Sequence, residues 1–202
     1  MTRATPLRRG DLDPDPLRQF EAWYAAAQAA GEQFPQAFAL ATSTPDGRPS
    51  VRMVLLKSAD ETGFVFYSSY ESRKGGELAA NPRAALCFYW HGLGRQARIE
   101  GTAAPVSDDE ADAYFATRPA GSRLSASVSR QSEAVGSRAE LEDAVAELRA
   151  RLGEEVPRPA SWGGFRVSPD VYEFWQHRDD RLHDRFRYRR EAGAWIAERL
   201  AP

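Results

Sequence analysis

Apolar residues recur at helical spacing in two segments of the chain. The first repeat consists of Leu17, Phe20, Tyr24 and Ala27. The second consists of Leu141, Val145, Leu148 and Leu152. Gly31 follows the first repeat and Pro157 follows the second, and both residues favour helix termination. The pattern therefore predicts an amphipathic helix near the N-terminus and another in the third quarter of the chain.

The other apolar residues lie in short runs that are separated by turn residues. These runs span residues 37–42, 51–57, 64–68, 84–90, 96–106, 162–175, 181–190 and 195–200. Pro45-Asp46-Gly47 separates the first two runs, which predicts a β-hairpin. Because strands and turns follow one another without a βαβα alternation, the chain is expected to be mainly β, an antiparallel barrel with flanking α-helices.

Two further helices begin at recognisable N-cap residues. Ser72 opens a short helix that stops at Asn81-Pro82. Ser107 and Glu110 form the Ser-x-x-Glu pattern of a capping box, so a helix is expected from there to just before Pro119. The polar stretch 122–137 is expected to separate it from the next helix. The predicted organisation is an extended arm over residues 1–15 and one domain over residues 16–202, with a helical insert at about 107–153.

Composition and charge narrow the possible classes of protein. The chain has 202 residues, 42% of them hydrophobic, which is enough for a sizeable core. The 27 Lys and Arg and 29 Asp and Glu give a net charge of −2, which argues against a nucleic-acid partner. The sequence contains neither a signal-peptide pattern nor an apolar run of membrane length, so we expect a cytoplasmic protein. No metal site is expected, because the histidines lack paired-ligand spacing and Cys87 is the one cysteine.

Basic residues occur in pairs within or beside apolar segments. Arg73 and Lys74 follow Ser72 at a helix N-terminus, where free N–H groups and the helix dipole favour a phosphate, although a solvated helix start has the same pattern. Arg52 and Lys57 flank Met53, Val54, Leu55 and Leu56. By strand alternation the two cations point to opposite faces, so both reach one ligand only if the strand bulges or Lys57 acts from its end.

The segment Arg181-Leu182-His183-Asp184-Arg185 concentrates charge near the C-terminus. If it is a strand, Arg181, His183 and Arg185 share a face and could hold an anionic ligand. The alternative is an exposed strand in which Asp184 neutralises its neighbours. A second candidate anion site is formed by Tyr114, Arg118 and Ser122, which are spaced by four residues, although helix-end capping explains this spacing equally well.

Taken together, several ordered motifs resemble the pyridoxamine/pyridoxine 5'-phosphate oxidase family. They are Arg52-Met53-Val54-Leu55-Leu56-Lys57, Ser72-Arg73-Lys74, Gln131-Ser132-Glu133, Trp162-Gly163-Gly164-Phe165-Arg166, Phe174-Trp175-Gln176, Arg181-Leu182-His183-Asp184-Arg185-Phe186 and Arg199-Leu200-Ala201-Pro202. The resemblance covers about residues 11–202. It implies a homodimeric FMN-binding split β-barrel, with FMN at the subunit interface, that oxidises pyridoxine or pyridoxamine 5'-phosphate to pyridoxal 5'-phosphate and passes the electrons to O2, forming hydrogen peroxide.

The resemblance also implies roles for individual residues. FMN would be bound by Arg52, Met53, Val54, Leu55, Leu56, Lys57, Tyr67, Ser68, Arg73, Lys74, Gln96, Gln131, Ser132, Trp175 and Arg185. The substrate would be bound by Lys57, Tyr114, Arg118, Ser122, Arg181 and His183, the last two being catalytic. Some of the FMN contacts would come from the second subunit.

Two positions depart from the family pattern, and two other functions remain open. No tyrosine follows Arg8-Arg9 to build an arm over the substrate, and Phe34 precedes Pro35 where relatives often have an acidic residue. A related split-barrel flavin or deazaflavin reductase would share the barrel but should lack the sets containing Tyr114 and Arg181. A non-catalytic carrier of flavin or a vitamin B6 phosphate is the other alternative.

Overall fold

The structure is a computed structural model that describes residues 6–202. Its elements, in chain order, are η1 (Arg9–Asp11), α1 (Pro16–Ala29), β1 (Ala37–Ser43), β2 (Pro49–Leu55), β3 (Ser58–Asp60), β4 (Gly63–Ser69), α2 (Arg73–Ala80), β5 (Arg83–Trp90), β6 (Arg95–Pro105), α3 (Asp108–Thr117), α4 (Ala120–Val128), α5 (Arg138–Leu152), β7 (Trp162–Gln176), η2 (Asp179–Arg181), β8 (Asp184–Glu191) and β9 (Ala194–Arg199). Within the described residues, no helix is long and apolar enough to span a membrane.

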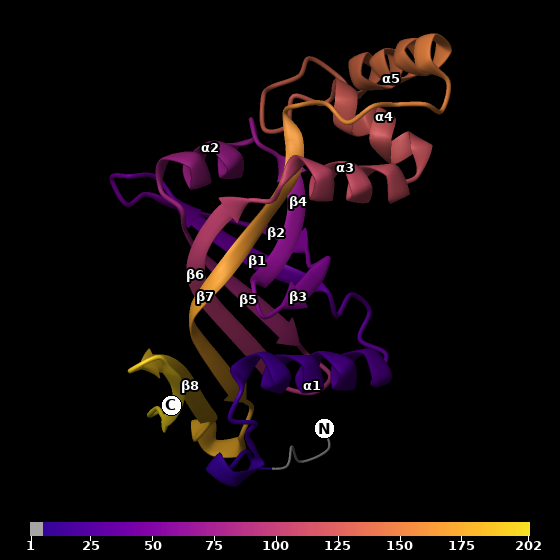
Figure 1. Cartoon of the computed structure of the whole chain (residues 1–202). Helices are drawn as coiled ribbons and strands as arrows, with labels where there is room; N and C mark the ends of the chain where they lie inside the picture. Colours follow the sequence, from indigo (N-terminus) through magenta and orange to yellow (C-terminus); the bar gives the residue numbers. More distant parts are fainter. Residues whose placement is uncertain (1–5) are drawn as a thin grey trace.

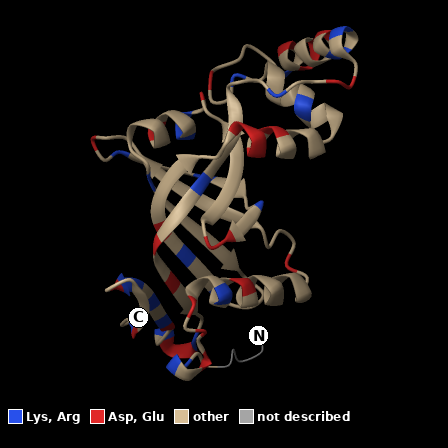
Figure 2. Ribbon diagram, in the orientation of Figure 1, with Lys and Arg blue, Asp and Glu red and all other residues tan. Residues whose placement is uncertain are grey.

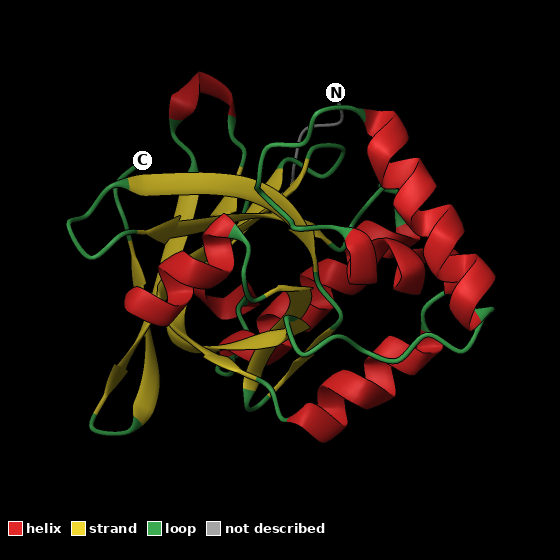
Figure 3. Cartoon of the chain, turned by 90° about the horizontal axis from the view of Figure 1, so that it is seen from above, coloured by secondary structure: helices red, strands yellow, loops and turns green. Residues whose placement is uncertain are grey.

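The strands form one antiparallel sheet that curls into a half-open barrel (Figures 1 and 3). Its main path runs β2-β1-β5-β6-β7-β4-β3, and the hairpin of β8 and β9 is added through β7. Each pairing is antiparallel, and the expected β-hairpin is formed by β1 and β2. The predicted class, a mainly β split barrel with flanking helices, is confirmed.

Strand β7 joins the two halves of the sheet. Its first part, from Trp162 to Val167, pairs with β4, whereas its last part, from Val171 to Gln176, pairs with β8. The other edge of β7 pairs with β6 along almost its full length, with a register shift at Glu100/Gly101. As a result, the sheet divides along one edge of β7, with α3 near one end of this strand and β8 near the other (Figure 1).

Aromatic side chains fill the barrel, and α1 covers one opening. Phe20 of α1 packs edge-on against Phe64 and Phe88, with ring centroids 4.9 Å away in both cases. All three rings are at most 1% exposed. Burying one such side chain stabilises a fold by roughly 1.5–3 kcal/mol, so the helical spacing seen in the sequence reflects core packing. The structure ends α1 just before Gly31, which has φ +74°, in agreement with the prediction.

The polar stretch after Pro119 differs from the prediction. The stretch expected to separate two helices contains α4, for which Pro119 is the N-cap residue. Leu124 of α4 is fully buried against Leu148 of α5 and Val156. The few apolar residues of this stretch were too sparse to show a helical repeat, and the helix is stabilised by this small separate core.

The segment before β8 also differs from the prediction. Asp180 and Arg181 have φ of +59° and +63°, so the chain turns in a short 3-10 segment and β8 begins only at Asp184. The expectation that Arg181, His183 and Arg185 share one strand face is therefore wrong. Asp184 is nearly buried and accepts hydrogen bonds from Leu7 N and Arg199 Nη1, which fixes the start of the strand.

The predicted N-terminal arm lies partly outside the described residues, because residues 1–5 are not described. From residue 6 onward the arm is not fully extended, since Arg9–Asp11 form a 3-10 turn. Leu7 is buried, and its carbonyl accepts a hydrogen bond from Arg199 Nη2. Contacts with the C-terminal hairpin therefore hold this part of the arm.

Two adjacent glycines of α2 offer a matched test of how the barrel positions this helix. A Cβ at Gly75 would lie 2.1 Å from the backbone O of Tyr70, whereas a Cβ at Gly76 would meet nothing within 4 Å. We expect Gly76→Ala to stabilise the protein by up to about 1 kcal/mol through helix propensity. Gly75→Ala should destabilise it by about 1–3 kcal/mol, because the added Cβ would force α2 and the backbone of Tyr70 apart. Urea unfolding of both variants measures the difference, and equal effects would contradict the close approach of α2 to Tyr70.

Candidate phosphate-binding cleft

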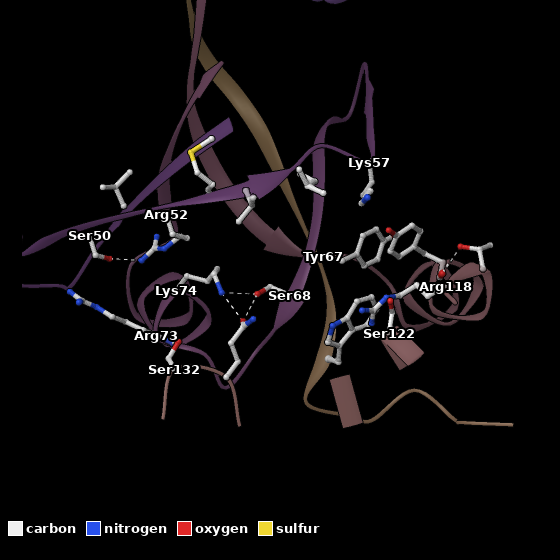
Figure 4. A pocket seen from close by; sticks show the side chains of 18 of the residues that line it. Ser50, Arg52, Lys57, Tyr67, Ser68, Arg73, Lys74, Arg118, Ser122 and Ser132 are labelled. Carbon is white, nitrogen blue, oxygen red and sulfur yellow. Dashed lines mark hydrogen bonds between the residues drawn. The ribbon is translucent and has the colours of Figure 1, made fainter. Parts of the chain in front are cut away.

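A cleft of about 870 Å³ opens between β2, β4, α2 and α3. Figure 4 shows two groups of basic side chains in it: Arg52, Arg73 and Lys74 lie on one side, and Lys57 and Arg118 lie on the other, with Tyr67 between. Both groups contain residues that the sequence singled out, although they come from separate segments of the chain. The cleft therefore brings together two candidate anion sites.

The first cation group lies at the N-terminus of α2. Ser72 is the N-cap residue and accepts a hydrogen bond from Gly75 N, as the sequence predicted. Lys74 is 7% exposed, and its Nζ donates to Ser68 Oγ at 2.8 Å and Gln131 Oε1 at 2.8 Å. Within the described chain no carboxylate pairs with Lys74. Burial, and then the positive charge of Arg52, lower the pKa of Lys74 to about 8.

A single buried carboxylate, Glu77, organises the two arginines of this group. Its Oε2 lies 3.3 Å from Arg52 Nη2, and its Oε1 lies 2.9 Å from Arg73 Nε. Burial alone would raise the pKa of Glu77, but hydrogen bonds, those from Ser50 and Thr42 foremost, hold it at about 2. Glu77 is therefore ionised at neutral pH. Arg52, Arg73, Lys74 and Glu77 together carry a net charge of about +2, which suits a phosphate dianion.

The second cation group lies across the cleft. Arg118 stacks on Trp162, with its guanidinium carbon 4.5 Å from the ring centroid, and its buried Nη1 has no hydrogen-bond partner among the described residues. Lys57 Nζ lies 5.7 Å from the ring centroid of Tyr114. Because β2 ends at Leu55, Lys57 acts from beyond the strand end and lines the same cleft as Arg52. Strand alternation had left open whether Arg52 and Lys57 could reach the same ligand, and the structure places both in one cleft.

Stacked aromatic rings form the wall between the two groups. Tyr67 stacks on Tyr114 with centroids 3.9 Å apart and on Trp162 at 5.4 Å. Burial, and then the charge of Glu110, raise the pKa of Tyr67 to about 12, so its hydroxyl stays protonated. The wall is therefore neutral and flat, a surface suited to a planar ring.

Five other predicted residues lie together at the far end of the sheet. Cross-strand pairing places Gln96 opposite Trp175, and Trp175 opposite Arg185. The ring of His183 lies 4.6 Å from that of Trp175, and Arg181 is two residues away in the preceding turn. Figure 2 shows Lys and Arg positions both on α2 and along β8, at opposite ends of the sheet. We call the five residues Gln96, Trp175, Arg181, His183 and Arg185 the C-terminal cluster.

Hydrogen bonds orient two members of the C-terminal cluster. Arg185 donates from Nε to Glu173 Oε1 at 2.9 Å and from Nη1 to the carbonyl of Ala201 at 2.9 Å. His183 Nδ1 accepts from Arg178 N at 3.1 Å, so the proton of the neutral ring is on Nε2. Burial, then His177 and Arg181, lower the pKa of His183, and the neutral ring therefore presents an N–H donor at neutral pH.

Most of the predicted site residues thus fall into two places. The cleft is lined by Arg52, Met53, Val54, Leu55, Lys57, Tyr67, Ser68, Arg73, Lys74, Tyr114, Arg118, Ser122, Gln131 and Ser132. The side chain of Leu56 does not line it and packs in the core. Sequence reasoning missed Glu77 and Glu173, which form ion pairs with arginines. Glu77 could have been found, because it follows Arg73 by four residues on a helix. Among residues 6–202, no group of His, Cys, Asp or Glu is arranged to hold a metal.

The residues of the cleft fit two phosphate esters. A buried ammonium without an acidic partner costs several kcal/mol unless an anion is present, and Lys74 is such a group. The unpartnered Nη1 of Arg118 is a second donor without an acceptor. The two lie on opposite sides of an aromatic wall (Figure 4), as two ligands with adjacent rings and separate phosphates would require.

Two family models together match most of the chain. The family model described as pyridoxamine 5'-phosphate oxidase matches residues 25–152, and the model described as the pyridoxine 5'-phosphate oxidase C-terminal dimerisation region matches residues 162–202. A relative from Rubrobacter xylanophilus, named pyridoxine/pyridoxamine 5'-phosphate oxidase, is 59% identical over 97% of this chain and 91% of its own. A relative of the same name from Cupriavidus taiwanensis is 51% identical over all of both chains.

Solved structures share the fold. PhzG from Burkholderia lata, in complex with tetrahydrophenazine-1-carboxylic acid, is 35% identical with a TM-score of 0.94 over all of both chains. A pyridoxamine 5'-phosphate oxidase-related, FMN binding protein from Nostoc punctiforme shares the fold, with a TM-score of 0.73 at 18% identity over 95% of this chain and all of its own. On the family matches and the full-length identities, the chain belongs to the pyridoxine/pyridoxamine 5'-phosphate oxidase family of flavoprotein oxidoreductases.

Proposed function

We propose that this protein binds FMN and oxidises pyridoxine or pyridoxamine 5'-phosphate to pyridoxal 5'-phosphate, with O2 reduced to hydrogen peroxide. The observation that carries the proposal is the pair of cation groups in one cleft, one around the buried Lys74 and one around Arg118. A flavin mononucleotide and a vitamin B6 phosphate each have one flat ring system and one phosphate. Two anion sites on either side of an aromatic wall match that pair of ligands.

The site around α2 suits the phosphate of FMN. Lys74, Arg52 and Arg73 supply positive charge, and the positive end of the α2 dipole adds to it. Glu77 holds the two guanidiniums in place, while Ser68, Gln131 and Ser132 offer neutral hydrogen-bonding groups nearby. When bound, FMN supplies the electron acceptor for the oxidation.

The opposite side of the cleft suits the phosphate of the substrate. Arg118 and Lys57 provide charge, and the hydroxyls of Tyr114 and Ser122 provide further contacts. Stacking of Arg118 on Trp162 fixes the guanidinium plane, which reduces the entropy lost when a phosphate binds. These contacts would anchor the substrate at one end and leave its reacting carbon free to be aligned against the flavin.

A complete site requires a second copy of the chain. Trp162 lines the cleft, but Trp175 lies thirteen residues further along β7, up to roughly 40 Å away at about 3.3 Å per residue. The edge strand β2 exposes Val51 and Met53, which are 68% and 65% exposed, as apolar surface that a partner could cover. We therefore propose a homodimer in which the C-terminal cluster of one copy reaches the cleft of the other.

In such a dimer the C-terminal cluster faces the reacting rings. Trp175, Gln96 and Arg185 would contact the flavin, with Arg185 held by Glu173. Arg181 would lie over the substrate ring and stabilise developing charge. Neutral His183 would donate its Nε2 proton in a hydrogen bond to a polar group of the substrate, because its Nδ1 already accepts from the backbone.

Three other functions compete with this proposal. A flavin or deazaflavin reductase would not need the second anion site around Arg118. A non-catalytic carrier would bind the same ligands without turnover. The likeness to PhzG, which was solved with a tricyclic carboxylic acid, suggests a cleft that could accept a bulkier ring, with Arg118 holding a carboxylate.

The decisive measurement is turnover by the purified protein supplied with FMN. We expect yellow protein that converts pyridoxine 5'-phosphate to equal amounts of pyridoxal 5'-phosphate and hydrogen peroxide, followed by absorbance and a peroxidase-coupled assay. Pyridoxine without the phosphate should react at least about tenfold more slowly in kcat/KM, because the contacts at Arg118 are lost. Yellow but inert protein would favour the carrier, and oxidation of tetrahydrophenazine-1-carboxylic acid in preference to the B6 phosphate would favour a PhzG-like function.

Lys74→Met should weaken the binding of FMN much more than the binding of riboflavin. Loss of a charge-assisted contact of about 1.5–3 kcal/mol should weaken FMN binding about ten- to hundredfold and leave riboflavin, which lacks the phosphate, nearly unchanged. Lys74 has a pKa of about 8 in the flavin-free protein, so the wild type should bind FMN best below pH 8. Its affinity should then fall by up to about tenfold per pH unit above that value. Fluorescence titration from pH 7 to 10 measures both effects, and an unchanged slope in the variant would contradict the role of Lys74.

Mixing two inactive variants tests the shared site. Arg181→Ala and His183→Ala should each bind FMN but lose turnover, and unchanged turnover in both would show that their assignment is wrong. Arg118→Ala, which changes the opposite part of the proposed site, should also be inactive. Refolded one-to-one mixtures of Arg118→Ala and His183→Ala should recover roughly a quarter of wild-type activity, since half the dimers have one intact site. If mass spectrometry verifies mixed dimers but no activity is recovered, Arg118 and His183 of the same copy serve one site.

A further inference from the structure

Arg166 lies outside the cleft lining, yet it connects the two elements that form the substrate side of the cleft. It belongs to the Trp162-Gly163-Gly164-Phe165-Arg166 motif, and no role has been given to it so far. On β7 it lies opposite Val65 of β4. Its side chain is 23% exposed, and the guanidinium reaches across the face of the sheet to β3 on one side and α3 on the other.

The contacts of Arg166 form a clamp. Nη1 donates to both carboxylate oxygens of Asp60 at 3.2 Å, and Nη2 donates to both carboxylate oxygens of Glu110 at 3.0 Å. Asp60 is the last residue of β3, and Glu110 is in the first turn of α3. The planar fork of arginine can hold two carboxylates in fixed directions, which a lysine ammonium cannot do.

Each end of the clamp lies close in sequence to a phosphate-binding residue. Lys57 immediately precedes β3, and its N–H donates to Val65 O at 2.9 Å, which extends the pairing toward the cleft. Tyr114 follows Glu110 by four residues and therefore lies on the same side of α3. Tyr67 hydroxyl also approaches Glu110 O at 3.5 Å, beneath the stacked Tyr114.

We propose that Arg166 is a positioning residue that sets the distance between Lys57 and the α3 residues Tyr114 and Arg118. The inference rests on the proposed function, since it assumes that these residues hold the substrate phosphate. α3 has a separate anchor in Arg158, which donates to Asp108 and Asp112, so the helix stays attached when the clamp is removed. Among residues 6–202, no hydrogen bond or ion pair joins the clamp to the cations around Lys74, so FMN affinity should change less than substrate affinity.

The test compares Arg166→Met with Arg166→Lys, which keeps the charge but cannot bridge both carboxylates. Both variants should raise KM for pyridoxine 5'-phosphate about tenfold, with kcat and FMN affinity within about twofold of wild type, because only substrate positioning is lost. The same loss, about tenfold in Kd for pyridoxal 5'-phosphate, should appear by calorimetry on the flavin-free protein. Arg166→Lys with wild-type KM would show that charge alone matters and would overturn the inference.

A second variant shows whether the clamp works as a unit. Glu110→Gln leaves the pair of Arg166 with Asp60 but removes the charge and one of the two acceptor oxygens from the link to α3, so it should raise KM by up to a similar factor. In the double variant with Arg166→Met the effects should not add, whereas independent effects would multiply to about a hundredfold and contradict the clamp. Glu110→Gln is nearly isosteric, so it keeps the test valid if Arg166→Met fails to fold.

Arg83→Met is the matched control. It removes another arginine, whose Nη1 lies 2.6 Å from Asp170 Oδ2. Because this pair does not line the cleft, the variant should leave KM unchanged. If wild-type protein oxidises pyridoxine 5'-phosphate and all clamp variants match it, only the inference about Arg166 fails. If the wild type neither binds FMN nor oxidises the phosphate ester, the proposed function fails, and the role of Arg166 in it fails too.

Discussion

Strand β7 is the constraint on which both the fold and the site depend. It pairs with β6 along one edge and with β4 and β8 in turn along the other, so it holds the two halves of the sheet together. Its first residue, Trp162, supports Arg118 in the cleft, while Glu173 near its end orients Arg185. Because one strand carries parts of the cleft and of the C-terminal cluster far apart, the proposed site draws on two copies of the chain, in keeping with the match to a dimerisation region.

Uncompensated positive charge is the second organising feature. Many arginines of the described chain pair with a carboxylate, but Lys74 is buried among neutral oxygens, and Arg118 has a buried N–H without an acceptor. Such groups destabilise the free protein and are stabilised when an anion binds. Glu77 limits the charge on the α2 side and fixes the arginines, so these cations are held in place before any ligand arrives.

The local elements of the fold were largely predictable from the sequence. The caps at Ser72 and Ser107, the end of α1 before Gly31 and the hairpin of β1 and β2 all follow from short-range rules, and the structure confirms them. α4 was missed because its stability comes from Leu124 packing on α5, a contact between segments about 25 residues apart. The turn at Arg181 was missed because its left-handed residues are Asp180 and Arg181, and no glycine marks the turn in the sequence.

The sequence by itself determined the fold class and the family, because residue type and spacing carry that information, and it predicted the residues that we propose surround the phosphate groups. Only the tertiary structure decided how those residues are divided. It brought Lys57 beyond the end of β2 into the same cleft as Arg52, and it left Gln96, Trp175 and Arg185 at the other end of the sheet. It also identified the partners of the arginines, Glu77, Glu173 and the pair held by Arg166. Distances between strands depend on register and curvature, which no local pattern encodes.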